Sequence, residues 1–402
     1  MKKLLFMAIA SMMLFSSCEK DPIDPPVYTV LSGTLTENMT LTADKEWTLK
    51  GYVYVPEGIT LTIEPGTVIK SDIAEKGALT IERGGKIMAE GTADKPIVFT
   101  SGNDFPIAGD WGGIVILGRA TTNKGEATIE GGIGRMYGGT NDDDNSGVLK
   151  YVRIEYAGIA AFANSEVNAL TLGAVGRGTT IEFVECYYSN DDAFEFFGGT
   201  VNPKYLVAVS TADDDYDFDF GYTGTVQYAI SKRDPLFVDG GDAGNGIECD
   251  NDATGSTATP TTHPKLLNFT LIGPASSQSL SNHNLAMRWR RGANFTVRNS
   301  VFYGYMKGCF SVESDITASY YRDNQGNFTN NFLHSVDTNF VVVSKATNSL
   351  TTADMIVKVQ HDGNTIYKGS QSPVLNSFET ISGNIGAIPQ GTTNWLIGWT
   401  RF

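Results

Sequence analysis

The sequence predicts an all-β protein that folds as a single parallel β-helix. Short segments that alternate apolar and polar residues recur along the chain, and this period is typical of strands with one buried face. Residues 61–66 and 79–84 match at five of six positions and start 18 residues apart. A repeat of this length suits one coil of a parallel β-helix, in which equivalent strands stack about 4.8 Å apart.

The other strand candidates follow in chain order and are separated by Gly, Asn and Asp residues. They are residues 96–100, 111–117, 148–156, 180–188, 205–210, 225–231, 266–272 and 295–302. An antiparallel sandwich or a propeller is the alternative, but a propeller blade needs about 40 residues. The leucine spacing of a leucine-rich repeat is missing from the sequence. We therefore expect one solenoid domain over residues 28–402.

The composition is that of a globular protein with a large core and an acidic surface. The chain is 41% hydrophobic, and 45 acidic against 30 basic residues give a formal net charge of -15. A net negative charge gives no electrostatic attraction to nucleic acid, so we expect no nucleic-acid partner. Cations and neutral or basic ligands remain candidates.

The first residues predict export and lipid anchoring. Two lysines precede an apolar run over residues 4–15, which is too short to span a bilayer and is followed by two serines and Cys18. Residues 15–18 resemble the lipobox of bacterial lipoproteins, which implies cleavage before Cys18 and a diacylglyceryl group on its sulfur. An ordinary secretory signal is the alternative. We expect a signal peptide over 1–17 and a Pro-rich tether over 18–27, with Cys18 anchoring the protein in the outer membrane at the cell surface.

Four segments of the middle of the chain superimpose, and they start at residues 191, 213, 244 and 284. Alternate positions of these segments form two apolar columns, which are Phe194, Tyr216, Ile247 and Met287, and then Phe196, Phe218, Cys249 and Trp289. We expect both columns to point inward, because stacked apolar residues bury the face that one coil cannot bury alone. The three cysteines Cys186, Cys249 and Cys309 are too few and too dispersed for a disulfide framework, and we expect them to be small buried hydrophobic residues.

The intervening positions are expected to face outward and to carry most of the charge. They form the columns Glu195, Asp217, Glu248 and Arg288, and Phe197, Asp219, Asp250 and Arg290, and Asp213 and Asp215 extend the acidic set. Like charges about 5 Å apart repel by about 3 kcal/mol at an effective dielectric constant near 20.

A bound cation is one way to relieve this repulsion. Oxygen-rich clusters suit Ca²⁺, and the candidate ligands are Glu195, Asp213, Asp215, Asp217, Asp219, Glu248 and Asp250. Arg288 and Arg290 are candidate ligand-binding residues that also neutralise the acids. The alternative is an acidic patch that faces water and binds no metal. We expect no organic cofactor.

Several motifs resemble those of a known group of proteins. Residues 63–69, 110–118, 191–201 and 245–248 are similar to segments of Bacteroidetes surface lipoproteins with a right-handed parallel β-helix. This resemblance implies the fold and surface display; the group has no agreed biochemical role, so it implies no activity.

The same fold class includes pectate lyases and polygalacturonases, whose active sites lie on an outward face near acidic residues. By that analogy, an enzyme would use Glu195, Asp217, Glu248 and Arg288 as catalytic residues. The Gly-His-Gly and Arg-x-Lys segments of the hydrolases are absent from this sequence.

The sequence therefore favours a lipid-anchored surface protein that binds an extracellular ligand, a glycan or a surface protein, with Ca²⁺ on its acidic face. A polysaccharide lyase or glycoside hydrolase is the first alternative, and a structural or adhesive envelope component is the second. Near the C-terminus, Trp395 and Trp399 are expected to cap the last coil, and exposed platforms for sugar stacking are the alternative.

Overall fold

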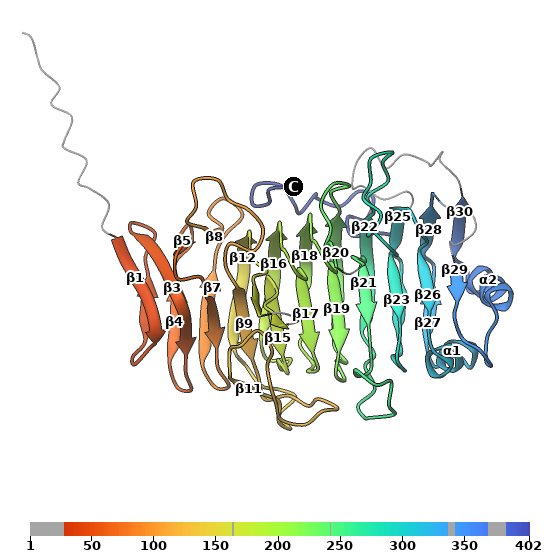
Figure 1. The fold of residues 1–402 in the computed structure, drawn as a ribbon, viewed down its shortest axis with the longest axis horizontal. Coiled ribbons are helices and arrows are strands. Elements are labelled where there is room, and N and C mark those ends of the chain that lie inside the picture. Colours follow the sequence, from red (N-terminus) through yellow and green to blue (C-terminus); the bar gives the residue numbers. More distant parts are fainter. Residues whose placement is uncertain (1–27, 163–164, 242, 337–341, 369–382) are drawn as a thin grey trace, which may run out of the picture.

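Parallel pairing between successive coils builds the molecule. The computed structural model describes residues 28–162, 165–241, 243–336, 342–368 and 383–402. In Figure 1 the strands lie side by side along the long axis, from β1 (Tyr28–Thr34) at one end to β30 (Thr365–Lys368) at the other. The predicted all-β parallel solenoid is therefore confirmed. The signal peptide over 1–17, the lipidation of Cys18 and the tether over 18–27 fall outside the described residues.

Three ladders of parallel strands form three faces that run along the molecule. Five long strands contribute their first halves to the first face and their second halves to the second: β12 (Gly147–Glu155), β16 (Thr180–Tyr187), β18 (Lys204–Val209), β20 (Thr225–Lys232) and β22 (Lys265–Ile272). The first face also contains β2 (Met39–Leu41), β4 (Thr60–Ile63), β7 (Lys86–Glu90), β24 (Thr296–Arg298) and β27 (Asn327–Thr329). The second face also contains the first half of β3 (Glu46–Val55), β5 (Val68–Ser71), β8 (Ile97–Ser101), β25 (Val301–Tyr305), β28 (Phe332–Ser335) and β30.

The third face carries the segments that superimpose in the sequence. It contains the second half of β3, β6 (Ala78–Ile81), β9 (Gly113–Leu117), β15 (Leu170–Gly173), β17 (Phe194–Phe197), β19 (Tyr216–Asp219), β21 (Ile247–Cys249), β23 (Met287–Trp289), β26 (Phe310–Val312) and β29 (Val342–Ser344). Two short antiparallel pairs lie in loops: β10 (Ala127–Thr128) with β11 (Met136–Tyr137), and β13 (Ala160–Phe162) with β14 (Ser165–Glu166).

The apolar columns fill the interior, as the alternation predicts. Phe194, Phe196, Phe218 and Trp289 are completely buried. Phe196 and Phe218 stack with ring centroids 4.8 Å apart, because parallel pairing sets one ring over the next. The cysteines Cys186, Cys249 and Cys309 are free and buried, as expected.

The first face turns into the second at one residue per coil, and this residue has a positive φ. We call these residues the corner column; they are Tyr151, Phe183, Tyr205, Tyr228, Asn268, Asn299 and Asn330, with φ between 51° and 60°. The single left-handed residue interrupts the pairing, so that Lys150 pairs with Glu182 and then Val152 with Val184. Each corner side chain therefore lies outside the regular alternation of its strand.

Two helices lie at the C-terminal end of the solenoid (Figure 1). They are α1 (Asp315–Arg322), capped by Ser314, and α2 (Thr352–His361), capped by Thr351. Met355 and Val359 of α2 are buried and belong to the main core. No helix in the described part of the chain has the length and apolar character needed to cross a bilayer.

The final residues run back along the outside of the solenoid, and the chain ends over its middle (Figure 1). We call residues 383–402 the C-terminal strap. Asn268 Nδ2 donates to the carbonyl of Asn384 at 2.7 Å, and Arg153 Nη1 donates to that of Trp399 at 3.1 Å. The prediction that Trp395 and Trp399 cap the last coil is therefore wrong. The last coils bury their apolar side chains against α1 and α2, and the strap instead covers outward-facing apolar residues of the second face.

Candidate functional site

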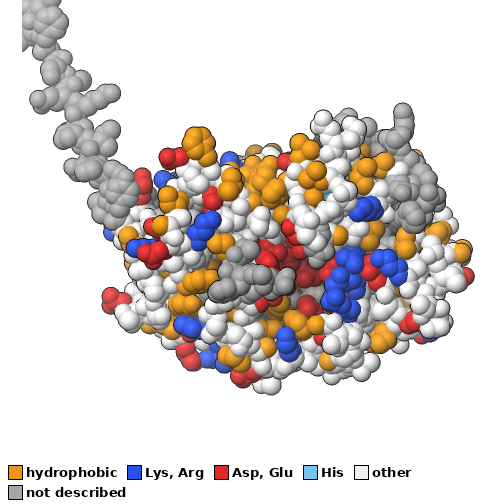
Figure 2. Space-filling view, in the orientation of Figure 1, with side chains coloured by type: hydrophobic (Ala, Val, Ile, Leu, Met, Phe, Trp, Pro, Cys, Tyr) orange, Lys and Arg blue, Asp and Glu red, His pale blue; other side chains and the backbone are white. Residues whose placement is uncertain are grey.

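The charged column on the third face has the predicted register. Glu195 pairs with Asp217 across β17 and β19, Asp217 with Glu248 across β21, and Glu248 with Arg288 across β23. In Figure 2, acidic side chains gather over the middle of this face and basic side chains lie directly beside them. The charge changes sign along the solenoid axis because the outward residue changes from acid to arginine between two coils.

Five carboxylates converge at the start of these strands, and we call them the acidic cluster. Asp191, Asp192 and Asp213 form one group, and Asp192, Glu195 and Asp217 form another; within each group the ligand oxygens lie within 4.8 Å of one another. Asp192 joins the two groups. Asp191 and Asp192 are not among the predicted metal ligands, although they occupy the positions that Asp213 and Asp214 occupy one coil later.

A ladder of side-chain hydrogen bonds fixes the turn before each strand. The backbone N–H of Asp214 donates to Asp192 Oδ1 at 2.8 Å, and the backbone N–H of Asn245 donates to Asp214 Oδ1 at 2.6 Å. In the coil before, Asn168 Nδ2 donates to the carboxylate of Glu195. Asp192 and Glu195 of the acidic cluster are thus each anchored to a neighbouring coil, which helps to hold the cluster in place.

Burial makes ionisation of these groups unfavourable. Burial, together with the charges of Glu248 and Asp214, raises the pKa of Asp217 well above its usual range. Burial and neighbouring acids also raise the pKa of Glu195, Asp191 and Asp192. Such carboxylates need a proton or a cation beside them at neutral pH.

Asp215 does not lie on the outer face, and its predicted place in the outward acidic set is wrong. Its side chain is only 1% exposed, and its Oδ1 lies 3.0 Å from Nη1 of Arg233, whose side chain is fully buried. Asp215 comes one residue before β19, in the turn, where the alternation of the strand no longer applies. The carboxylate therefore points into the interior and is neutralised there.

Arg233, which the sequence does not predict as a site residue, positions the turns of this site. Its guanidinium also donates to the carbonyls of Asn245 at 2.5 Å and Asp213 at 2.7 Å. These contacts tie together two turns that carry the acidic cluster and the ladder. An isolated arginine at the end of a strand gave no signal of burial, because its partners come from other coils.

The acids of the next coil are paired with arginines. Glu248 lies 2.9 Å from Arg288 Nη1 and 2.5 Å from Arg290 Nη2, and Asp250 binds Arg290 and Arg291. Asp219, half-buried, accepts the backbone N–H of the next residue at 2.6 Å. Glu248, Asp250 and Asp219 thus belong to neither of the two groups of converging carboxylates, although Glu248 lies next to Asp217 in the ladder.

An arginine-lined pocket of about 410 Å³ adjoins these ion pairs. Its lining includes Arg288, Arg290, Arg291 and Glu313. Burial alone would lower the pKa of Arg288, but its hydrogen bonds to Glu313 and the charge of Glu248 raise it. Arg288 therefore stays cationic, which suits the binding of an anion and opposes a role as a base.

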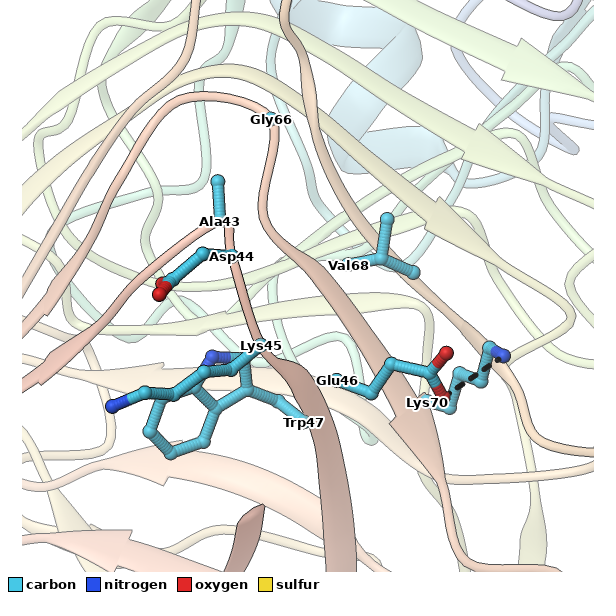
Figure 3. Close-up of a pocket in the computed structure, with 8 residues that line it drawn as sticks. All are labelled: Ala43, Asp44, Lys45, Glu46, Trp47, Gly66, Val68 and Lys70. Atoms are coloured by element: carbon cyan, nitrogen blue, oxygen red, sulfur yellow. Dashed lines mark ion pairs between the residues drawn. The ribbon is translucent and has the colours of Figure 1, made fainter. Parts of the chain in front are cut away.

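A further pocket, of about 400 Å³, lies near the N-terminal end of the solenoid around Trp47 and Val68. Figure 3 shows an ion pair between two residues of the lining, Glu46 and Lys70. Lys70 Nζ lies 3.8 Å from Glu46 Oε2. Both side chains are about half exposed, so this ion pair contributes little to the stability of the fold. It provides no reactive group.

Comparison with known proteins supports the fold. A family model described as a pectate-lyase-like β-helix domain matches residues 33–400. No curated protein and no solved structure matches the chain. Because the family model covers nearly all of the described solenoid, the chain belongs to the family of pectate-lyase-like β-helix domains.

Proposed function

We propose that this protein is anchored by lipid at the cell surface and binds an extracellular glycan through a Ca²⁺ ion held by the acidic cluster. One observation carries the proposal: five carboxylates, Asp191, Asp192, Glu195, Asp213 and Asp217, converge on an outward face beside an arginine-lined pocket. The lipobox-like segment ending at Cys18 supports the anchoring.

The environment of the acidic cluster favours a cation. Among the residues that the structure describes, the ion pairs include none of Asp191, Asp192, Glu195 and Asp217. Ca²⁺ accepts six to eight oxygen ligands in a loose geometry. The two groups of carboxylates that share Asp192 can supply some of these oxygens. A bound ion would replace repulsion between neighbouring carboxylates with attraction to a common centre.

The neighbouring arginines favour an acidic glycan as the ligand. Ca²⁺ coordinated by protein carboxylates retains sites for oxygens of a ligand. Arg291 lies beside the acidic residues with its side chain 45% exposed and reaches the pocket that Arg288 and Arg290 also line. A carboxylated polysaccharide would offer one carboxylate to the ion and another to a guanidinium.

A glycoside hydrolase or lyase is the second candidate. Its support is that the converging carboxylates have raised pKa values, because glycosidases use an acid and a base carboxyl close together. The paired state of Arg288 opposes a lyase mechanism in which that residue removes a proton.

The test is to titrate the purified protein with Ca²⁺ and then with polygalacturonate. Ca²⁺ at a hundredfold excess over its dissociation constant should stabilise the fold by about 2.7 kcal/mol, and polygalacturonate should bind only when Ca²⁺ is present. Asp217→Asn should lose both effects, whereas Glu64→Gln, at an exposed turn, should retain them.

Two results separate the candidates. Release of unsaturated or reducing ends from polygalacturonate would assign the enzymatic function. An unchanged melting temperature with chelator and with excess Ca²⁺, together with no polysaccharide binding, would contradict the proposal.

A further inference from the structure

An aromatic pocket lies away from the acidic cluster, where the first face meets the second. Its floor is formed by the corner residues Phe183, Tyr205 and Tyr228, and Trp395 of the C-terminal strap forms part of its wall. The three floor rings are stacked nearly parallel, with centroids 4.3 Å apart for the first pair and 5.1 Å for the second. The coils of the solenoid thus hold a row of aromatic rings at one surface position.

The residues that carry these rings have a backbone conformation that Asn adopts more readily. Phe183, Tyr205 and Tyr228 have φ of 55°, 60° and 60°, where a residue with a bulky side chain is strained by about 1–2 kcal/mol. The same corner in later coils is occupied by Asn268 and Asn299, and Asn tolerates positive φ. The corner itself therefore does not require aromatic residues.

The C-terminal strap covers only part of this row of aromatic rings. Trp399 is buried and meets Tyr151 and Phe183 edge to face, at 5.8 and 6.0 Å. Trp395 meets Tyr205 at 5.2 Å and is held by a 2.9 Å bond from its Nε1 to the carbonyl of Ala387, yet it stays half-buried. Strap packing therefore leaves a rigid aromatic surface open at Trp395 and Tyr228.

The chemistry of the pocket selects against a charged ligand. Its volume is about 270 Å³, and none of its lining residues carries a charge, although the chain has a net charge of -15. Four of the lining residues carry hydroxyl groups: Tyr205, Tyr228, Thr392 and Thr393. An apolar patch rimmed by polar groups is typical of a ligand-binding site.

We propose that this pocket binds a neutral sugar unit of a glycan, independently of Ca²⁺. A sugar ring presents apolar C–H groups on its face, which would pack on Trp395 and Tyr228, and hydroxyls at its edge, which would bond to the tyrosine and threonine hydroxyls. The site lies on β16, β18 and β20, whereas the acidic cluster lies at β17 and β19. The inference therefore goes beyond the proposed function and does not depend on it.

Trp395 provides the readout of the test. The other tryptophans, Trp47, Trp111, Trp289 and Trp399, are at most 3% exposed, so contact at the pocket changes the fluorescence of Trp395 above all. The intact protein, in chelator, is titrated with neutral hexasaccharides of glucose, xylose and mannose. At least one of them should change the fluorescence and bind with saturation.

Matched variants locate the binding. Binding to the variants is measured by isothermal titration calorimetry, because Trp395→Ala removes the fluorescent reporter. Trp395→Ala and Tyr228→Ala should each weaken binding about tenfold or more. Tyr228→Asn, which places at this corner the residue of later coils, should fold normally and still bind weakly. Tyr367→Ala, an exposed tyrosine of β30, should bind like the unmodified chain.

Three results would overturn the inference. They are no binding by any neutral hexasaccharide, binding that Trp395→Ala and Tyr228→Asn leave unchanged, and binding that requires Ca²⁺ or is lost in Asp217→Asn. The last result would place the sugar at the acidic cluster, so a failure here is distinguishable from a failure of the proposed function.

Discussion

At the scale of single residues, the protonation of the third face follows from burial. Asp214 accepts hydrogen bonds from the backbone N–H and the side chain of Asn245, at 2.6 and 2.8 Å, and both lower its pKa. Burial and the nearby charge of Asp213 outweigh them and raise the pKa of Asp214 to about 8. Burial likewise raises the pKa of Asp219 to about 8. These carboxyl groups therefore hold protons in the folded chain at a pH where the unfolded chain has lost them.

This difference predicts how stability depends on pH. Because the folded state binds more protons than the unfolded state between about pH 4 and 8, the free energy of unfolding should fall as the pH rises through that range. The loss should be on the order of a few kcal/mol in chelator. Ca²⁺ should reduce it, because the ion replaces the protons and binds more tightly at higher pH. Melting temperatures at several pH values, with and without Ca²⁺, measure the effect.

The variant Asp214→Asn provides the control. It mimics the protonated side chain, so the decline in stability with pH should be shallower than in the unmodified protein. A melting temperature that rises between pH 5 and 8 in chelator would contradict the assignment of raised pKa values to this face.

At the scale of structural elements, the turns before the third-face strands depend on one buried ion pair. Arg233 lies at the end of the second face, just beyond β20, and its guanidinium reaches Asp215 and the carbonyls of Thr211 and Asp213. The guanidinium thereby satisfies backbone carbonyls that a turn leaves without partners. The shape of the acidic cluster is therefore set in part by a residue that is not exposed.

Replacing Arg233 should strongly destabilise the folded protein. Arg233→Met should lower the free energy of unfolding by about 3–5 kcal/mol, because it leaves a buried carboxylate and several carbonyls unpaired. The double variant Arg233→Met with Asp215→Asn should lose less than the sum of the two single variants. Denaturant unfolding of all three variants measures these differences. Arg322→Met, at an exposed helix position, is the control and should cost under about 0.5 kcal/mol.

At the scale of the whole molecule, contacts run mainly between neighbouring coils, and the strap is one of the segments that reach farther. It passes several coils and joins them, since Arg401 N–H donates to Glu185 at 2.9 Å while Ala387 N–H donates to Thr270. A solenoid otherwise behaves as a row of units, each stabilised by its neighbours. The strap should therefore make the middle coils unfold together.

Trp399→Ala tests this role. The ring is completely buried against the second face, so its removal should cost about 3–5 kcal/mol. Hydrogen exchange should rise in the strap and in β16, β18 and β20, and should stay unchanged in β4 and β5. An equal rise in exchange along the whole solenoid would show that the strap does not act on these coils in particular.

The amino-acid sequence alone determined the coil and its register. Alternation and the spacing of the repeats predict the stacking of Phe196 on Phe218 and of Glu195 on Asp217, because parallel pairing requires only that equivalent positions recur. Both pairs are found in the structure. Local periodicity is sufficient to predict the register where each coil contacts only its neighbours.

Only the tertiary structure decided what lies at the corners and beyond the repeats. It turns Asp215 inward to Arg233, joins Asp191 and Asp192 to the acidic cluster, and folds the strap with Trp395 and Trp399 back over the middle coils. At a turn the alternation of inward and outward side chains ends, so the direction of a side chain depends on partners that are distant in the sequence. The strap carries no repeat, and its place is set by the apolar surface it covers.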